Sequence, residues 1–224
     1  NDHKVTDLLY MCQQLAAHNL NFDEVYNIVK NRYTEICEGL KLNFDIHGIL
    51  EDIKEKIRLG ASRDYAASRG EYINGLILSH YLGYEFVDAA ELILFDKNGK
   101  FDAKNTYEKV RSRLANVSCA VIPGFYGVMP DGEIKTFSRG GSDITSSIIA
   151  RGVGAQLYEN WTDVSGFLMA DPKIVKNPRP IEKVTYKELR ELSYMGASVL
   201  HEEAIFPTKE AGIPIVIKNT NAPD

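Results

Sequence analysis

Apolar residues recur at helical spacing through the first third of the chain. Two sets fall every three or four positions, as on one face of a helix: Val5, Leu8, Leu9, Cys12 and Leu15, then Ile46, Ile49, Leu50, Ile53 and Ile57. Asn21 and Glu24 are spaced as a capping box that opens another helix. A further helix is expected over residues 68–78, starting beside a glycine, with Glu71 in its first turn. We therefore expect residues 1 to about 83 to be helical.

The pattern changes near residue 84, where short apolar runs replace the helical period. Strands are expected in these segments: 85–89, 91–95, 117–123, a hairpin at 127–136, 156–162 and 213–218. Helices are expected at 142–153 and, from a capping box of Thr185 and Glu188, through Met195. Alternating strands and helices predict an α/β sheet with helices on both faces. Ligands of such sheets bind at the carboxyl ends of strands, so the loops after Pro123, Thr136 and Trp161 are candidates for one common site.

A glycine turn that leads into the helix at 142–153 carries the strongest chemical signal. Gly140 and Gly141 permit positive φ and close approach of backbone to a ligand, and Ser142 and Asp143 suit a helix N-cap. Glycines 152 and 154 are expected to stop this helix. The free N–H groups and the dipole of a helix N-terminus attract an anion. Arg139 adds a planar cation and Asp143 an anion, so the turn suits a ligand with both charges; an ordinary capped helix with a solvated Arg139 fits the spacing equally well.

Composition indicates an ordinary globular chain. Its 224 residues can bury a sizeable core, and 26 Lys and Arg against 31 Asp and Glu give a net charge of −5 without long runs of one sign. This weighs against a nucleic-acid or membrane-surface function. No apolar run reaches the ~18 residues of a membrane helix. The three cysteines lack metal-site spacing and indicate reduced core residues of a cytoplasmic protein, so the sequons at Asn116 and Asn160 are given no weight.

Several short motifs occur in an order that resembles the aspartokinases. They are Ser-Arg-Gly-Glu at 68–71, Ser-Arg-Gly-Gly-Ser-Asp at 138–143, Thr-Asp-Val at 162–164, Ala-Asp-Pro-Lys at 170–173, Met-Gly-Ala-Ser-Val-Leu-His at 195–201 and Ile-Lys-Asn-Thr at 217–220. The resemblance covers nearly the whole chain. It implies an amino-acid-kinase-like three-layer sandwich, with a mainly parallel sheet between helices. It also implies transfer of the γ-phosphoryl group of ATP, with Mg²⁺, to the side-chain carboxylate of L-aspartate. The product, 4-phospho-L-aspartate, is the first intermediate toward lysine, threonine, methionine and isoleucine.

The resemblance also assigns site residues. Arg139 would hold a substrate carboxylate, Glu71 the α-ammonium group, and Asp143 would help to fix the amino acid or the arginine. Backbone N–H groups of the turn would face the substrate or the transferring phosphoryl group: Gly140, Gly141 and Ser142. The nucleotide would contact a second set: Thr162, Asp163, Leu168, Asp171, Lys173, Ser198 and Val199. No protein metal ligands are expected, and His201 beside two glutamates is interpreted as structural.

The chain departs from the family pattern at three nucleotide positions and at both ends. Leu168, Lys173 and Ser198 stand where the family usually has tyrosine, arginine and lysine. The family's leading Lys-Phe-Gly-Gly segment and its terminal ACT domains are missing, so we expect a partial single domain over 1–224, inactive alone. It would comprise a helical part to about 83 and an α/β part from about 84. The full-length protein would be a homo-oligomer through the ACT domains, with no nucleic-acid or membrane partner. Alternatives are another acid-phosphorylating amino-acid kinase, or a non-catalytic pseudokinase or regulatory module.

Overall fold

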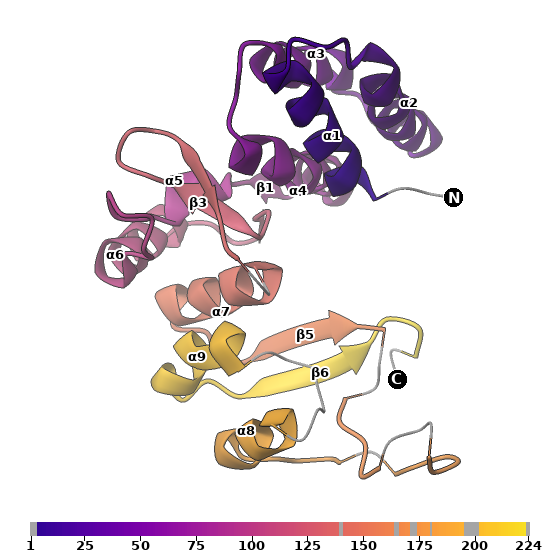
Figure 1. Cartoon of the computed structure of the whole chain (residues 1–224). Helices are drawn as coiled ribbons and strands as arrows, with labels where there is room; N and C mark the ends of the chain where they lie inside the picture. Colours follow the sequence, from indigo (N-terminus) through magenta and orange to yellow (C-terminus); the bar gives the residue numbers. More distant parts are fainter. Residues whose placement is uncertain are drawn as a thin grey trace. The chain divides into compact units, whose positions relative to one another are not determined.

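A computed structural model describes residues 4–138, 141–163, 166–170, 174–179, 181–194 and 202–222 (Figure 1). The chain forms two compact units, Asn1–Arg139 (unit 1) and Gly140–Asp224 (unit 2), which are described one at a time. Among the described residues, no helix is both long and apolar enough to cross a lipid bilayer.

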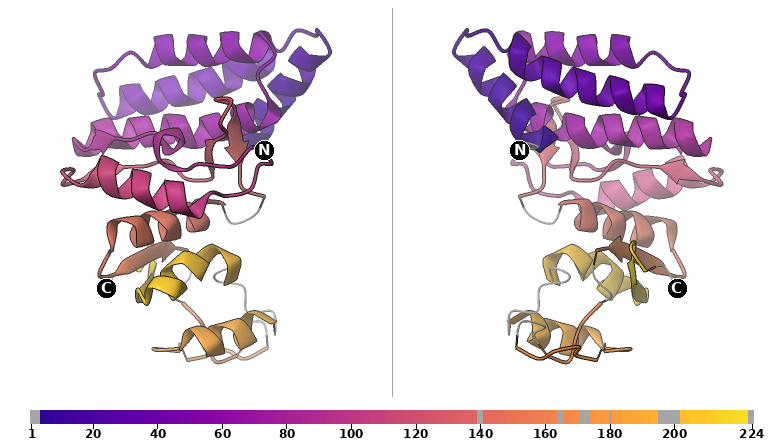
Figure 2. Two further views of the ribbon diagram at one scale, coloured as in Figure 1. Left: turned by 90° about the vertical axis from the view of Figure 1, so that its left-hand side faces the viewer. Right: turned by 90° about the vertical axis from the view of Figure 1, so that its right-hand side faces the viewer.

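Unit 1 begins with four helices, which lie between Val5 and Leu82, in the region where helices were expected. They are α1 (Val5–Ala17), α2 (Asp23–Gly39), α3 (Ile46–Arg58) and α4 (Arg63–Leu82). Figure 2 shows α2, α3 and α4 with their axes roughly parallel. Their apolar faces meet in one core, whose fully enclosed members include Leu9, Tyr26, Leu50, Ile57 and Ile73. The predicted period therefore marks the buried stripe of each helix.

Local caps fix where these helices begin and end. The Asp45 carboxylate accepts from Gly48 N at 2.8 Å, and Ser62 Oγ accepts from Tyr65 N at 3.1 Å, so each side chain satisfies a free N–H of a first turn. The helix expected from residue 68 therefore starts at Arg63, and the prediction that Glu71 lies in a first turn is wrong. It lies near the middle of α4.

The predicted capping box at Asn21 is also wrong in detail. Asn21 Oδ1 accepts from Asp23 N at 2.7 Å, which makes a local turn before α2. The N-cap residue of α2 is Phe22, which makes no side-chain cap bond. Asn21 therefore shapes the approach to the helix and does not pair with Glu24.

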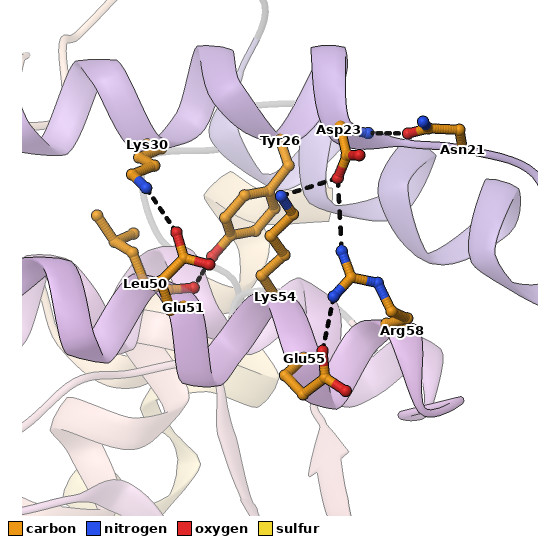
Figure 3. Close-up of polar contacts among 9 residues, drawn as sticks. All are labelled: Asn21, Asp23, Tyr26, Lys30, Leu50, Glu51, Lys54, Glu55 and Arg58. Carbon is orange, nitrogen blue, oxygen red and sulfur yellow. Dashed lines mark hydrogen bonds and ion pairs between the residues drawn. The ribbon is translucent and has the colours of Figure 1, made fainter.

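Polar contacts join α2 to α3 on the outer side of the core (Figure 3). Asp23 accepts from Lys54 Nζ at 2.8 Å and lies 3.5 Å from Arg58 Nη2. The hydroxyl of the buried Tyr26 donates to Leu50 O at 2.6 Å, which satisfies its one polar atom. Two more ion pairs lie beside these contacts: Lys30–Glu51 and Arg58–Glu55. Such exposed pairs contribute little each, so the apolar core carries most of the stability.

The remainder of unit 1 mixes short strands and helices. They are β1 (Glu85–Phe86), α5 (Ala89–Leu92), α6 (Ala103–Leu114), β2 (Ala120–Val121), β3 (Tyr126–Val128) and β4 (Ile134–Thr136). Strands β1 and β2 pair in parallel, and β3 and β4 form the predicted antiparallel hairpin. The strand expected at 91–95 is wrong in its first half: Leu92 closes the α5 turn, and only Leu94 and Phe95 form isolated bridges.

Unit 2 is built on one parallel strand pair. Its elements are α7 (Gly141–Val153), β5 (Tyr158–Thr162), α8 (Tyr186–Tyr194), α9 (Glu202–Ala211) and β6 (Ile215–Asn219). Strands β5 and β6 pair from Tyr158 with Ile215 to Thr162 with Asn219. Helices α7 and α8 lie on opposite sides of this pair (Figure 1), as expected for a layered α/β arrangement.

The helix boundaries of unit 2 partly match the sequence. The capping box is confirmed: Glu188 accepts from Thr185 N at 2.7 Å, and Glu188 N donates to Thr185 Oγ1 at 3.2 Å. Helix α8 ends at Tyr194, and Met195 lies outside the described residues. Because α7 already includes Gly141, Ser142 and Asp143 belong to its first turn and are not its N-cap. Residue 152 lies inside α7, and the chain leaves the helix at Gly154, whose φ is +68°.

Candidate active site

The first turn of α7 holds three of the predicted site residues. Gly141 is buried, Ser142 is exposed and Asp143 is half-buried. Ser146 Oγ donates to Ser142 O at 3.0 Å, and Thr145 Oγ1 donates to Gly141 O at 2.8 Å. The first N–H groups of a helix have no acceptor within the helix itself. An anion can bind there, because these donors and the helix dipole act together.

Asp143 is held by a polar contact from β5. Its Oδ1 accepts from Asn160 Nδ2 at 3.1 Å, and the same amide nitrogen donates to the Tyr158 hydroxyl at 2.9 Å. Burial raises the pKa of Tyr158, the charge of Asp143 raises it further, and the hydrogen bond from Asn160 opposes both. The phenol therefore stays neutral at physiological pH and offers its proton or lone pairs to polar neighbours. These residues connect the start of α7 to the middle of the strand pair.

The carboxyl end of β5 carries two of the predicted nucleotide residues. The backbone oxygen of Thr162 accepts from Thr220 N at 2.8 Å and from Thr220 Oγ1 at 3.0 Å, which ties this end of β5 to the residue after β6. Thr162 Oγ1 donates to Asp163 Oδ1 at 3.3 Å, and Asp163 is exposed. Both residues thus lie at the edge where parallel sheets bind ligands.

An aromatic ring and a cation lie close to that edge. Lys218 Nζ is 5.0 Å from the centroid of the Trp161 ring and 3.0 Å from Glu159 Oε1. The hydrogen bond from Lys218 is the main cause that lowers the pKa of Glu159, with a smaller effect from the Trp161 N–H. Trp161 remains 46% exposed, so it presents a flat face to solvent. A planar base could stack on the Trp161 ring, and a phosphate could pair with Lys218.

Leu168 is half-buried and follows the buried Phe167. Residues on either side of Leu168 pair with a returning segment: Met169 N donates to Arg179 O at 2.9 Å and Ile181 N donates to Phe167 O at 2.7 Å. Leu168 therefore belongs to a backbone-paired loop and offers an apolar surface, without the hydroxyl that the family's usual tyrosine would supply.

Glu71 is the predicted site residue in the described part of unit 1. It is half-buried on α4, and burial raises the pKa of its carboxyl. Within the described part of the chain it has neither a hydrogen bond nor an ion pair. Burial raises the pKa of the nearby Tyr33, and the charge of Glu71 raises it further; the Tyr33 hydroxyl donates to Gly70 O at 3.2 Å. A desolvated carboxylate without a partner is suited to bind an ammonium group.

The remaining predicted site residues lie outside the described ranges: Arg139, Gly140, Asp171, Lys173, Ser198 and Val199. The segment 195–201, with His201, does so as well. Within the part of the chain that is described, no group of three or more His, Cys, Asp or Glu side chains is arranged to hold a metal ion.

Two residues near Asp143 were not predicted from the sequence. Asn160 and Tyr158 alternate along β5 and so face the same side of the strand, which is a signal that the sequence does contain. Asn160 stood out only as part of a sequon, to which no weight was given. In the structure the side-chain amide of Asn160 donates to both Asp143 and Tyr158.

The chain belongs to the amino acid kinase family. The model of that family, described as "Amino acid kinase family", matches residues 13–219. This confirms the family and the fold class expected from the ordered motifs.

Similar proteins, with solved structures or without, support this family assignment. The crystal structure of aspartate kinase from Clostridium acetobutylicum has 60% sequence identity and a TM-score of 0.95, covering 100% of this chain and 51% of that one. Aspartokinase 3 of Bacillus subtilis is 38% identical over 99% of this chain and 52% of its own length. Aspartokinase III of E. coli, in complex with aspartate and ADP, has a TM-score of 0.81 at 24% identity over 99% of this chain and 54% of its own, which supports the fold. The chain spans about half the length of these relatives.

Proposed function

We propose that this chain is the catalytic part of an aspartate kinase. The enzyme transfers the γ-phosphoryl group of ATP to the side-chain carboxylate of L-aspartate and forms 4-phospho-L-aspartate. The observation that carries the proposal is the match over the full chain to the Clostridium acetobutylicum aspartate kinase, at 60% identity. The ordered motifs at 68–71 and 138–143 supply the residues that such an enzyme needs.

The amino acid substrate carries two charges besides the reacting carboxylate. Arg139 binds its α-carboxylate through a bidentate pair, and Glu71 binds its α-ammonium group. Support for the second contact comes from the half-buried Glu71 carboxylate, which has no partner among the described residues. Asp143, held by Asn160 at 3.1 Å, orients the amino acid or Arg139.

The reaction requires alignment and charge neutralisation more than proton transfer. An aspartate carboxylate is already ionised at neutral pH, so no general base has to activate it. The backbone N–H groups of Gly140, Gly141 and Ser142 stabilise the charge of the transferring group, and the helix dipole of α7 adds to them. Residue types in this turn fit the role because glycines let the ligand approach the backbone closely.

The nucleotide binds at the carboxyl end of β5 and the loops that follow. Its contacts are assigned to Thr162, Asp163, Leu168, Asp171, Lys173, Ser198 and Val199. Trp161 and Lys218 add a ring and a cation on the same edge. Magnesium, which neutralises phosphate charge, binds together with the nucleotide.

Assembly and location complete the proposal. The resemblance to aspartokinases supports the proposal that the full-length enzyme assembles as a homo-oligomer through regulatory domains. ATP as the phosphoryl donor and reduced core cysteines such as Cys12 indicate the cytoplasm.

The test is an assay of the full-length protein with ATP, magnesium and L-aspartate, in which hydroxylamine traps the acyl phosphate. Arg139→Ala is expected to lower kcat/KM for aspartate at least tenfold, because a charge-assisted bidentate contact contributes about 1.5–3 kcal/mol. The matched control is Arg111→Ala, which removes an exposed arginine on α6. Equal kcat/KM in both variants would remove Arg139 from the site. Turnover with another carboxylic acid in place of aspartate would identify a different member of the family, and absence of turnover would indicate a non-catalytic module.

A further inference from the structure

Unit 1 contains a hollow of about 470 Å³, and none of the residues that line it is assigned to the proposed aspartate kinase reaction. It lies between α3 and α4. One face of α3 supplies Ile49, Asp52 and Lys56 to its wall, and one face of α4 supplies Tyr65, Arg69 and Tyr72. These residues recur at three- and four-residue steps, so each helix presents a continuous strip to the hollow.

Arg69 is an unusual member of this lining. It is only 6% exposed, and its Nε and Nη2 atoms donate to Ser68 Oγ at 3.1 and 2.9 Å. Its Cζ atom lies 4.4–4.6 Å from the ring centroids of Tyr72 and Tyr65, and 5.3 Å from that of Tyr126. Among the described residues, no carboxylate lies within ion-pair distance of it. Buried charges are normally paired, so a cation in this position lacks its counter-ion.

The third guanidinium nitrogen of Arg69 remains available for a hydrogen bond. Arg69 Nη1 has no acceptor among the described residues. In that same part of the chain, the buried side-chain nitrogen without a partner is Arg190 Nε, so Arg69 Nη1 is not sealed from solvent. Because Arg69 lines the hollow, the free N–H groups of Nη1 are available to a molecule inside it.

The charges of the lining restrict what can bind. Lys56 Nζ pairs with Asp52 Oδ2 at 2.8 Å at the exposed rim, and Asp45 accepts from the backbone N–H of Gly48, so Arg69 is the cation of this lining that has no ion-pair partner among the described residues. A singly charged anion is therefore favoured over phosphate, which carries nearly two charges. The rings of Tyr65 and Tyr72, with Ile49, offer an apolar surface for the body of a ligand.

We propose that this hollow binds a small organic monocarboxylate with an apolar or aromatic body, whose carboxylate accepts from Arg69 Nη1. The site is separate from the proposed aspartate site. Glu71 follows Arg69 by two residues, which turns it by about 200° around α4. The ligand is thus recognised by one buried guanidinium and two tyrosine rings, and Lys56 adds a weaker attraction at the rim.

The test is titration calorimetry of the full-length protein with sodium benzoate as the probe. Benzoate is expected to bind one site per chain, and Arg69→Met is expected to weaken it about tenfold or more, since the charge-assisted hydrogen bond is lost. Lys56→Glu reverses a charge at the rim and is expected to weaken binding about threefold. Lys30→Glu is the matched control: it makes the same change on α2, outside the hollow, and is expected to leave benzoate affinity unchanged.

Circular dichroism shows whether Arg69→Met remains folded, and if it does not, the comparison of Lys56→Glu with Lys30→Glu decides. The proposal is overturned if benzoate produces no saturable heat, or if its affinity is the same in the Lys56 and Lys30 variants. It is also overturned if inorganic phosphate binds as tightly as benzoate, or if L-aspartate displaces benzoate competitively, which would place the probe in the substrate site. Saturable binding that depends on Arg69 and persists with aspartate bound supports it.

Discussion

The two units are stabilised in different ways. In unit 1 the apolar stripes of α1 to α4 share one core, and its polar contacts lie largely outside that core (Figure 3). The described part of unit 2 has two small apolar clusters, around Ile205 and around Tyr158, and a buried hydrogen bond between α7 and α9 from Ser147 to Thr208. Most candidate residues belong to unit 2. The large apolar core thus lies in unit 1, whereas most candidate site residues lie in unit 2. This agrees with the general observation that ligand-binding segments often have low local stability.

The largest effect on stability is expected when apolar volume is removed from the core of unit 1. Leu50 is 0% exposed, so Leu50→Ala is expected to lower the free energy of unfolding by about 2–5 kcal/mol. Leu59→Ala, at a residue that is 77% exposed, is expected to stay within about 0.5 kcal/mol of the wild type. Urea unfolding gives both values. Similar losses in the two variants would show that the core of α1 to α4 does not dominate unit 1.

In unit 2 the removal of a buried hydroxyl is expected to cost more stability than the removal of an exposed one. Ser147 Oγ accepts from Thr208 N at 3.1 Å and contacts Thr208 Oγ1 at 3.2 Å, and both residues are fully buried. Ser147→Ala leaves these groups without their partner and is expected to cost about 1–3 kcal/mol. Ser112→Ala, at an exposed position of α6, is the control. Hydrogen exchange should locate the effect in α7 and α9. Increased exchange in α1 to α4 instead would contradict the separation of the two units.

A third change separates stability from activity. Asn160→Ala removes the bond to Asp143 Oδ1 and is expected to lower kcat/KM for aspartate about tenfold, equivalent to about 1.4 kcal/mol. The urea midpoint should change little, because Asn160 is only half-buried. Asn98→Ala, at an exposed loop position, provides the control for removal of an asparagine amide. If activity falls only in proportion to folded protein, Asn160 does not position Asp143.

The smallest effect is expected at Glu71 and depends on pH. Burial raises the pKa of this carboxyl above its ordinary 4.5, so the folded protein holds the proton more tightly than the unfolded chain does. Stability from this group is present below pH 4.5 and is lost as the pH rises through the folded pKa. Glu71→Gln is therefore expected to raise the free energy of unfolding at pH 7 and to have no effect at pH 4 or below, while it weakens aspartate binding.

Urea unfolding at several pH values tests this, with the exposed Glu38→Gln on α2 as the matched control. A loss of stability at pH 7 would show that the Glu71 charge is compensated in the free protein. Such a result would also weaken its assignment to the substrate ammonium group.

The helical part and the capping box could be predicted because they depend on local sequence. The apolar period at Ile46 to Ile57 and the Thr185–Glu188 spacing each specify their contacts within a few residues. The start of α4 was missed because the residue that caps it, Ser62, lies six residues before the motif at 68–71, where the helix was expected to begin. The apolar run at 91–95 was ambiguous, since short runs suit a strand or a buried turn of helix equally. Local signals thus identified elements better than their boundaries.

The candidate site could be predicted only in part. The glycine turn and Glu71 stand out through residue type and through the resemblance to a known family. The contact from Asn160 to Asp143 spans 17 residues and exists only after β5 lies beside the start of α7. The unpaired guanidinium of Arg69 is equally invisible in the sequence, because its exposure and its missing counter-ion are properties of packing.

The parallel pair of β5 and β6 affects the order in which the chain can fold. Tyr158 pairs with Ile215, more than 50 residues later, so this pair must close a long loop before its first hydrogen bond forms. Neighbouring helices of unit 1 are joined by short connections, which favours rapid local folding. During synthesis, α1 to α4 can therefore assemble while β5 still waits for its partner strand. Helix α7, which follows the glycine turn, would therefore be supported by the complete strand pair only at a late stage. Until β6 pairs with it, β5 has an open edge with which a chaperone or another nascent chain could pair.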